Sequence, residues 1–390
     1  MVGSMTPSLV AIFLLGFSSL ATAANFNQVY QWNELDFEWP SEESRAQALK
    51  NETFKLENIY PRYMAVYGTR IFLSTYHSYA NPVSLVSLPM SSAFSASPKL
   101  TPVPSWDMHG KEGDCDKIER AKGIDVDSVG RLWLLDMGCL KCNIIKLWTI
   151  DLANNDQTKL VHQFPFHSLM HDLVVDETAN ETFVYISRGG LFYEEQIVVF
   201  SLERNESWIV QTPGIKVFCI ALSPLKNQEP RQLYLGEWSS SYLHSINSVA
   251  VLREGTGTAN TEKIGTLTAH PYRILVENNG NMLAAFFSVN YISSWNTSQS
   301  FAEKRFHEVD VLNSGKSFTF ALDQNGTLWM TVFDAVREPK YRLLKAAVGE
   351  QSLQATPTPE LHVATAASGG VQSRILMNSS LFFVFLLALF

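Results

Sequence analysis

Three residues in this sequence combine side chains that can move protons or hold a metal with positions at the ends of strand-like segments. His171 and Asp172 start one apolar run, and Glu237 ends another. An imidazole and carboxylates so placed can act as a general acid or base, or can coordinate a divalent cation. His167 lies four residues before His171, but this spacing makes a metal pair only on a helix, and the flanking Phe-rich and Val-rich residues indicate strand and loop. The histidine pair therefore favours a structural or solvent-facing role.

The sequence carries no recognisable catalytic motif. It has no Gly-x-Ser-x-Gly elbow, no phosphate-binding P-loop and no pair of zinc-type Cys-x-x-Cys motifs. The single Cys139-x-x-Cys142 element favours a disulfide role in an exported protein, and the four cysteines allow three complete pairings. The sequence therefore nominates no catalytic residue, no metal site and no cofactor.

The composition limits the size of the core and the classes of partner. The 390 residues are 46% hydrophobic, which is enough for a full-sized core in one domain or two. Acidic residues outnumber Lys and Arg by 38 to 30, and no basic run or basic amphipathic stretch is present. We therefore expect no nucleic-acid partner. The 12% of aromatic residues favours a sheet-rich protein.

One unit recurs six times along the chain: a short apolar strand that ends near an acid, a polar or glycine turn, and a second apolar strand. The first strands of the copies begin at Met64, Gly123, His171, Cys219, Tyr272 and Phe320. Equivalent positions are 60, 49, 47, 54 and 46 residues apart, close to the about 40 to 50 residues of a four-stranded blade. This spacing predicts an all-β, six-bladed β-propeller, with ordinary hairpins in a β-sandwich as the alternative.

The region before the first copy provides a candidate strand for closing the ring. A propeller joins the two ends of its chain in one blade, which removes exposed sheet edges. Residues 29–37 precede the first copy and could supply that strand. Because no long Pro/Gly/Ser linker interrupts the chain, we expect one propeller domain over residues 24–350.

The N-terminal residues predict export. An apolar run at residues 9–15 is followed by the small-x-small pattern of residues 21–23, and the run is too short for a membrane span of about 20 residues. We expect residues 1–23 to be a signal peptide. Five Asn-x-Ser/Thr sites predict a secreted glycoprotein: Asn51, Asn180, Asn205, Asn296 and Asn325. Asn180 and Asn325 are the strongest candidates because each lies between two strand-like runs.

Six short motifs occur in a fixed order along the mature chain. They are residues 32–37 (WNELDF), 104–106 leading to 115–118, 130–138 (GRLWLLDMG), 220–224, 233–235 and 328–329. In this order they resemble the insect yellow / major royal jelly protein family over nearly the whole mature length. The resemblance implies a six-bladed propeller with a central channel, secretion, and a role among cuticle pigmentation, eggshell formation, nutrient supply and amine binding in saliva.

The resemblance also bears on the cysteines. The positions of Cys115 and Cys142 correspond to a disulfide of the family, which implies that these two are bridged. Cys139 and Cys219 are left as a second bridge or as buried thiols. The chain departs from the family at Val129, where a cysteine is usual, so its disulfide pattern is partly altered.

A second departure concerns ligand binding. Amine-binding members resemble one another in a Thr/Ser-Asn-Arg-aromatic run after the last Leu-Trp pair, and this chain has residues 332–335, Val-Phe-Asp-Ala, instead. Phe333 replaces a ligand-binding Asn, so the amine site is not carried over. Asp334 could meet an ammonium group, although a solvated loop carboxylate is the favoured reading. The candidate channel-lining residues are His171, Asp172, Glu237, Phe333 and Asp334.

The C-terminal tail predicts a lipid anchor. Residues 351–368 are polar, small residues at 366–370 are followed by a mostly polar spacer, and residues 381–390 are apolar. This is the three-part pattern of a glycosylphosphatidylinositol (GPI) attachment signal. We expect attachment at Ser368 and removal of residues 369–390. Ten apolar residues are too few to cross a bilayer, so the anchor would be the chain's only membrane contact.

The sequence and the resemblance support three functional hypotheses. The leading one is a secreted or surface-anchored, non-enzymatic protein that acts with extracellular matrix or eggshell components in forming or pigmenting insect eggshell or cuticle. The second is a channel-based binder of a small aromatic amine or catechol. The third is a dopachrome-converting isomerase, for which the sequence nominates no acid or base.

Overall fold

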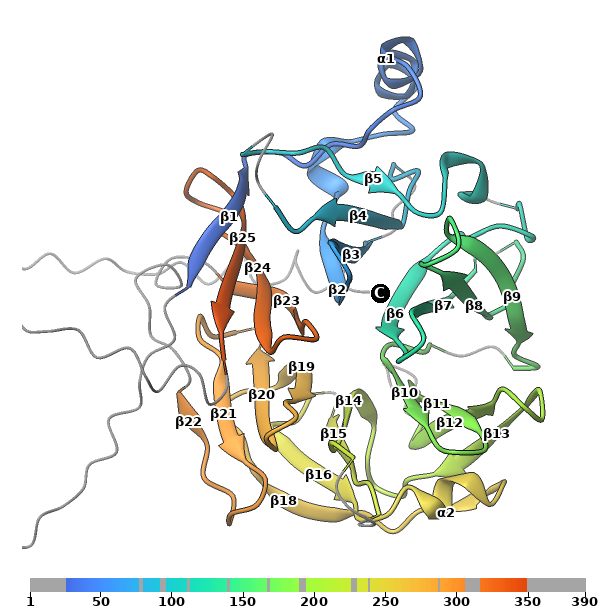
Figure 1. Cartoon of the computed structure of the whole chain (residues 1–390), viewed down its shortest axis with the longest axis vertical. Helices are drawn as coiled ribbons and strands as arrows, with labels where there is room; N and C mark the ends of the chain where they lie inside the picture. The colour runs from blue at the N-terminus through green and yellow to red at the C-terminus, as the bar shows by residue number, and fades with distance from the viewer. Residues whose placement is uncertain are drawn as a thin grey trace, which may run out of the picture. The chain divides into compact units, whose positions relative to one another are not determined.

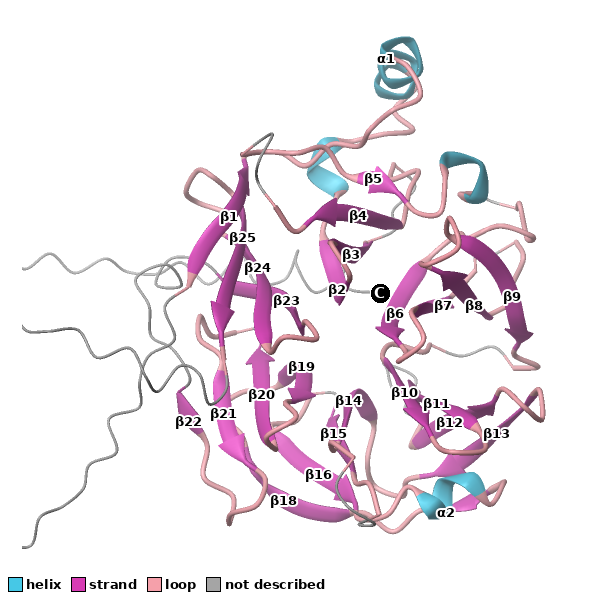
Figure 2. Cartoon of the chain, in the orientation of Figure 1, coloured by secondary structure: helices cyan, strands magenta, loops and turns pink. Residues whose placement is uncertain are grey.

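The computed structural model describes residues 26–348, apart from 77–79, 92–95, 111–112, 139–140, 167–168, 189–193, 226–229, 238, 287 and 306–315. The predicted signal peptide, His167, Cys139 and the C-terminal tail with Ser368 lie outside the described residues. Within them the chain forms six sheets arranged as blades around a central axis (Figure 1). The prediction of an all-β, six-bladed β-propeller is confirmed. Strands dominate every blade, and the helices lie at the periphery (Figure 2).

Each blade is a sheet whose first strand faces the axis, and the first three blades follow in chain order. Blade 1 contains β2 (Pro61–Tyr67), β3 (Arg70–Thr75), β4 (Leu85–Pro89) and β5 (Thr101–Pro102). Blade 2 contains β6 (Ala121–Val126), β7 (Arg131–Asp136), β8 (Lys146–Asp151) and β9 (Gln157–Gln163). Blade 3 contains β10 (Leu173–Glu177), β11 (Thr182–Arg188), β12 (Gln196–Ser201) and β13 (Glu206–Gln211), with β17 (Gly257–Thr258) added in parallel at its outer edge.

The remaining blades complete the ring. Blade 4 contains β14 (Val217–Leu222), β15 (Leu233–Glu237), β16 (Tyr242–Ile246) and β18 (Glu262–Thr266). Blade 5 contains β19 (Pro271–Val276), β20 (Asn281–Phe286), β21 (Ser293–Asn296) and β22 (Lys304–Arg305). Blade 6 contains β23 (Lys316–Leu322), β24 (Thr327–Phe333), β25 (Tyr341–Ala347) and β1 (Asn27–Trp32). The six predicted copies therefore correspond to the six inner strands β2, β6, β10, β14, β19 and β23.

Blade 6 joins the two ends of the domain. Strand β1 pairs antiparallel with β25, so that Trp32 lies opposite Tyr341. The predicted closing segment is confirmed as a strand, although the strand ends at Trp32 rather than at Phe37. This pairing covers the edge of β25 and closes the ring.

The helical elements are short and were not predicted. Helix α1 (Glu42–Lys50) begins after Ser41, whose side chain and that of Ser44 form a capping box, and none of its residues is buried. Helix α2 (Ala250–Arg253) covers the outer edge of blade 3, where the Leu252 carbonyl accepts a hydrogen bond from the Trp208 indole. Short 3₁₀ turns lie at Leu56–Asn58 and Trp106–Met108.

Blades 2 and 6 each have an aspartate that organises the turn between the first two strands of the blade. Asp127 follows β6 and accepts a hydrogen bond from the indole of Trp133 on β7 at 2.8 Å. Asp323 follows β23 and accepts the same bond from Trp329 on β24 at 3.0 Å. Both indoles are buried between blades. The recurring Gly-x-Leu-Trp sequence thus links a hairpin turn to the hydrophobic core.

Most inner strands contain a bulge close to their first residue. The register against the second strand is interrupted at Arg62 in β2, at residues 122–123 in β6, at Phe218 in β14, at Tyr272 in β19 and at residue 318 in β23. A bulge changes which side chains face the sheet and which face away. The bulges therefore determine the side chains that surround one end of the axis.

Candidate functional site

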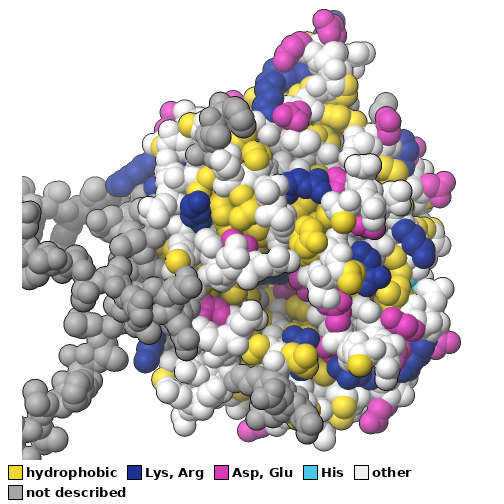
Figure 3. All heavy atoms as spheres, viewed as in Figure 1, with side chains coloured by type: hydrophobic (Ala, Val, Ile, Leu, Met, Phe, Trp, Pro, Cys, Tyr) yellow, Lys and Arg dark blue, Asp and Glu magenta, His cyan; other side chains and the backbone are white. Residues whose placement is uncertain are grey.

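The inner strands enclose a cavity of about 820 Å³ on the axis of the propeller. All six contribute, with backbone and apolar side chains forming most of the wall. The cavity extends to the turns that follow the inner strands, where Asp127, Glu277 and Asp323 line it. Figure 3 shows a hollow at the centre of the ring of blades. A concave site of this size holds a small organic molecule.

The carboxylates at the turns already form hydrogen bonds or ion pairs with other residues of the chain. Besides its bond to Trp133, Asp127 pairs with the guanidinium of Arg131 at 2.6 Å. Asp323 also accepts the Thr327 backbone N–H at 2.9 Å. Burial raises the pKa of Glu277 above its ordinary value, partly offset by Asn279 and Asn281. These carboxylates hold the turns in shape.

Asp125 is the acid that lies inside the wall. It follows Ile124 in β6, and its two oxygens accept hydrogen bonds from the backbone N–H groups of Val126 and of Val175 on β10, both at 2.9 Å. Burial raises its pKa to about 6, against the opposing effect of these bonds and of the Arg273 guanidinium. Asp125 therefore joins blades 2 and 3 and remains able to change charge near neutral pH.

Arg273 and Asp172 form a buried ion pair beside Asp125. The Nη1 of Arg273, on β19, donates to Oδ1 of Asp172, and the guanidinium lies 5.0 Å from the centre of the Tyr63 ring. Asp172 also accepts the Ile220 backbone N–H on β14 at 3.3 Å. Burial raises the pKa of Asp172, although Arg273 opposes this. The pair connects blades 3, 4 and 5 across the axis.

The residues predicted from the sequence lie around one end of the axis rather than in the wall of this cavity. His171 is buried just before β10, with its ring 4.7 Å from that of Phe218. Asp172 is bound to Arg273, as described. Glu237 ends β15, and its Oε2 lies 4.0 Å from Nε2 of His244. None of these three is among the cavity's lining residues.

The two candidate channel-lining residues from the last blade also have structural roles. Phe333 ends β24 and packs against Tyr60 and Tyr341, with ring centres 5.9 and 5.0 Å away. Asp334 is 3% exposed, and its Oδ1 accepts the backbone N–H groups of Val336 and Arg337 at 2.9 and 3.1 Å. The reading of Asp334 as a solvated loop carboxylate is wrong, because the carboxylate is buried and shapes the turn after β24.

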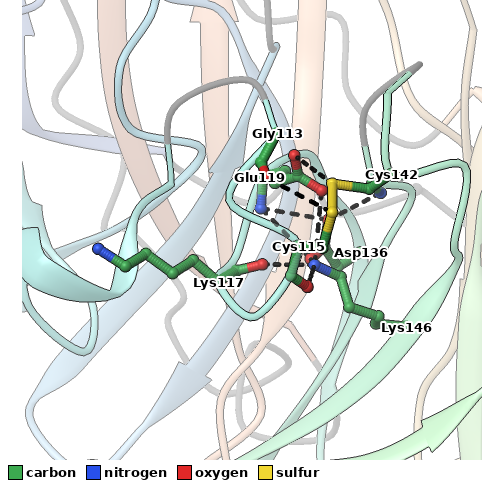
Figure 4. Close-up of a disulfide and its surroundings, with 8 residues drawn as sticks. Gly113, Cys115, Lys117, Glu119, Asp136, Cys142 and Lys146 are labelled. Carbon is green, nitrogen blue, oxygen red and sulfur yellow. Dashed lines mark hydrogen bonds and ion pairs between the residues drawn. A yellow bond between two sulfur atoms is a disulfide. The ribbon is translucent and has the colours of Figure 1, made fainter.

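The structure contains a disulfide between Cys115 and Cys142, with Cα atoms 5.4 Å apart (Figure 4). Beneath it lies Lys146, fully buried, whose Nζ is 3.1 Å from Oδ2 of Asp136 and 3.5 Å from Oε2 of Glu119. The same ammonium donates to the backbone carbonyls of Cys115 and Lys117 at 2.9 and 2.5 Å. Cys219 is a buried free thiol.

The five predicted glycosylation sites share one structural property. Each of the asparagines is exposed on the propeller surface: Asn51, Asn180, Asn205, Asn296 and Asn325. Asn205 and Asn325 lie in hairpin turns, and Asn325 is also at the mouth of the axial cavity. Glycosylation at these positions stays a prediction.

Sequence reasoning missed Asp125 and Arg273, the charged residues inside the wall. Asp125 lay within the recognised repeat, as an acid between Ile124 and Val126 in an inner strand that also contains Lys122, and that position was an available signal. Arg273 occupies the corresponding strand of blade 5. Their pairing with residues of other blades had no signature in the local sequence.

Among the described residues, no helix is both long and apolar enough to span a membrane. Comparison with solved structures finds a gluconolactonase from Xanthomonas campestris that is 13% identical, with a TM-score of 0.50, over 84% of this chain and 93% of that one. At this identity the similarity shows the fold alone.

Comparison with known sequences identifies closer relatives. The protein yellow of Drosophila subobscura is 24% identical over 370 residues, which cover 83% of this chain. The protein yellow of Drosophila melanogaster is 24% identical over 355 residues, or 79% of this chain. In both cases the chain spans 64% of the relative's length. The family model described as major royal jelly protein matches residues 121–217 and 211–331, more than half of the sequence. The chain therefore belongs to the yellow / major royal jelly protein family.

Proposed function

We propose that this protein is an extracellular, non-enzymatic member of the yellow family that acts in forming or pigmenting insect cuticle or eggshell. Family membership motivates the role, and the predicted signal peptide and five exposed Asn-x-Ser/Thr sites support a place outside the cell. The predicted lipid attachment at Ser368 would keep part of the protein on the surface of the secreting cell.

One observation supports a role without catalysis. The charged groups within the wall already make structural contacts between blades. Both oxygens of Asp125 accept backbone N–H groups, and Asp172 is paired with Arg273. A general acid or base must be able to exchange a proton with a substrate in reach. Groups that hold neighbouring blades together are poorly placed for this, whereas they give the propeller a rigid interior.

The test of this role is expression and loss of function in the source animal. We expect the transcript in epidermis or ovary, and we expect its knockdown to change cuticle colour or eggshell structure. Expression confined to salivary gland or gut would contradict the proposal. Treatment of expressing cells with phosphatidylinositol-specific phospholipase C should release the protein if Ser368 carries an anchor, and recovery of untreated protein with its tail intact would exclude the anchor.

The axial cavity favours a second candidate function, binding of a small aromatic amine or catechol. The cavity has the volume for one such molecule, and Asp125 offers a carboxylate that is ionised in its larger part at neutral pH. Calorimetry with dopamine, serotonin and dopachrome tests this. Binding that is weakened by Asp125→Asn supports the carrier, turnover of dopachrome would instead indicate an isomerase, and absence of heat with all three leaves the matrix role.

A further inference from the structure

The end of the axis away from the turn acids is surrounded by what we call the bulge ring: Arg62, Lys122, His171, Phe218 and Tyr272. Four of these residues occupy the bulges of their inner strands, and His171 directly precedes Asp172 at the start of β10. Because each bulge lies near the first residue of its strand, these side chains come to one level around the axis.

Two neighbouring members of the bulge ring are cations. Arg62 is only 8% exposed, and its guanidinium lies 4.5 Å from the centre of the Tyr76 ring. Within the part of the chain that the structure describes, no carboxylate contacts Arg62 or Lys122. Placing an unpaired charge in a protein interior is unfavourable unless a partner of opposite sign is supplied.

The acids nearest to the bulge ring are engaged elsewhere. Asp172 is bound by Arg273, and Asp125 accepts two backbone N–H groups. A further cation lies close by, since Arg120 donates to the backbone carbonyls of residues 137 and 138. Burial, with added repulsion from Arg62 and Arg120, places the pKa of Lys122 well below its ordinary value. The described residues at this end of the axis therefore supply no carboxylate partner to Arg62 or Lys122.

The other side of the bulge ring is aromatic. The rings of His171 and Phe218 lie 4.7 Å apart, and Phe218 and Tyr272 belong to one hydrophobic cluster. The Tyr272 hydroxyl donates to the Arg62 backbone carbonyl at 2.5 Å, which places the phenol beside the cations. A ligand that suits this ring has a flat apolar body and an anionic group at one end.

We propose that the bulge ring is a binding site for a small aromatic carboxylate. The carboxylate binds between Arg62, whose guanidinium can donate two parallel hydrogen bonds, and Lys122. The aromatic body packs against His171, Phe218 and Tyr272. This site is separate from the cavity at Asp125, and it favours an anion where that cavity favours a cation. The proposal does not depend on the proposed function.

Binding at this site is coupled to proton uptake. Burial lowers the pKa of Lys122 and the bound anion favours its charged form, so the affinity increases as the pH is lowered while the carboxylate of the ligand stays ionised. The charges that act on Lys122 are those of Arg62 and Arg120, and the backbone of His171 and Asp172 lies against the neighbouring Gly123. Because His171 and Asp172 could also contribute, the variant Lys122→Met identifies the lysine's share.

The experiment compares three probes that carry the same ring: indole-3-acetate (anionic), tryptophol (neutral) and tryptamine (cationic). Calorimetry on the secreted full-length protein should give an affinity for indole-3-acetate at least about tenfold higher than for the other two, with net proton uptake in buffers of different ionisation enthalpy. Equal or tighter binding of tryptophol, or no binding of indole-3-acetate, would overturn the proposal.

Variants connect the binding to the named residues. Arg62→Met and Lys122→Met should each weaken indole-3-acetate binding about tenfold or more, and Lys122→Met should also remove most of the proton uptake. The control Lys159→Met, on the exposed outer strand of the same blade, should change neither. Unchanged affinity in both ring variants contradicts the site.

The melting temperature tests whether Lys122 has a purely structural role. The variant Asp125→Asn separates binding at the bulge ring from binding in the axial cavity. Removing a half-buried amino group that has no carboxylate partner should leave the melting temperature of Lys122→Met at or above that of wild type, and a fall of more than about 4 °C would indicate that the lysine is structural. Asp125→Asn should leave indole-3-acetate binding unchanged while it weakens any amine binding. The two sites can therefore be tested independently, because Asp125→Asn weakens amine binding and the bulge-ring variants weaken carboxylate binding.

Discussion

Lys146 shows at the scale of a single residue how a buried charge can be satisfied. Its ammonium lies between Asp136 and Glu119 and donates to two backbone carbonyls, and all three charged side chains are buried. Each charge in this cluster therefore has a partner. Arg62 and Lys122 in the bulge ring differ from it in this respect.

We predict that Lys146→Met destabilises the protein by about 3–5 kcal/mol, because two carboxylates then remain buried without a cation. Urea unfolding measures the change. Lys159→Met, at an exposed position, should change the free energy of unfolding by no more than about 0.5 kcal/mol. Equal effects of the two substitutions would show that the buried cluster is not held together by Lys146.

Asp125 predicts a pH dependence of stability. Its pKa is raised by burial from 3.8 to about 6 in the folded protein. Between these values the folded state holds a proton that the unfolded state has released, so the contribution of Asp125 to stability falls as the pH rises from about 4 to about 7. The change amounts to at most about 3 kcal/mol.

Asp125→Asn keeps the shape of the side chain and removes this titration. The free energy of unfolding of wild type, measured relative to the variant by urea denaturation, should decrease across the same pH range. A difference that stays constant from pH 4 to pH 7 would rule out a raised pKa at Asp125.

At the scale of the elements, two glycines with the same backbone angle have different surroundings. Gly68 turns β2 into β3, and Gly138 follows β7 within the GRLWLLDMG motif; both have φ of 58°. A Cβ at Gly68 would meet no atom within 4 Å, whereas a Cβ at Gly138 would lie 2.3 Å from the backbone oxygen of Ile144. The two positions therefore separate conformational strain from steric overlap.

We predict that Gly68→Ala costs about 1–2 kcal/mol, the strain of a left-handed alanine. Gly138→Ala should cost about 1–3 kcal/mol more, because the Ile144 backbone must move away. Chemical denaturation of the two variants side by side measures the difference. Equal losses would mean that the loop after β7 adapts freely.

At the scale of the whole molecule, strand β1 closes the ring. Its deletion, with residues 1–23 retained, should expose the edge of β25 and produce aggregates or strand-exchanged dimers that the intact chain does not form. Size-exclusion chromatography with light scattering detects this. Addition of a synthetic peptide of residues 26–33 should reverse this association by filling the vacant edge. A stable monomer without β1 and without the peptide would contradict the closure.

The propeller could be predicted because its signal repeats. Short apolar strands and turns such as those at Gly130 and Gly326 recur at nearly constant spacing, and a segment before the first copy was available to close the ring. The peripheral additions β17 and α2 could not be predicted, since they pack on the outside of a blade and do not belong to the repeating unit.

The site was less accessible to sequence reasoning for a physical reason. Strand alternation predicts which side chains face the axis, but a bulge shifts the alternation, and the bulges at Arg62 and Lys122 leave no local mark in the sequence. Choosing residues at strand ends selected His171 and Asp172, which lie where the inner strand β10 begins. It could not show that Asp172 was bound to Arg273 from another blade.

The pairing of Trp32 with Tyr341 has a consequence for biosynthesis. The first strand to emerge from the ribosome is the partner of the last, so it must wait while more than 300 residues are added, about 15 to 60 s at about 5–20 residues per second. Five blades can assemble in order during this time, but the sixth cannot. The ring therefore closes only after β25 has been made, and until then the N-terminal strand has no partner in blade 6.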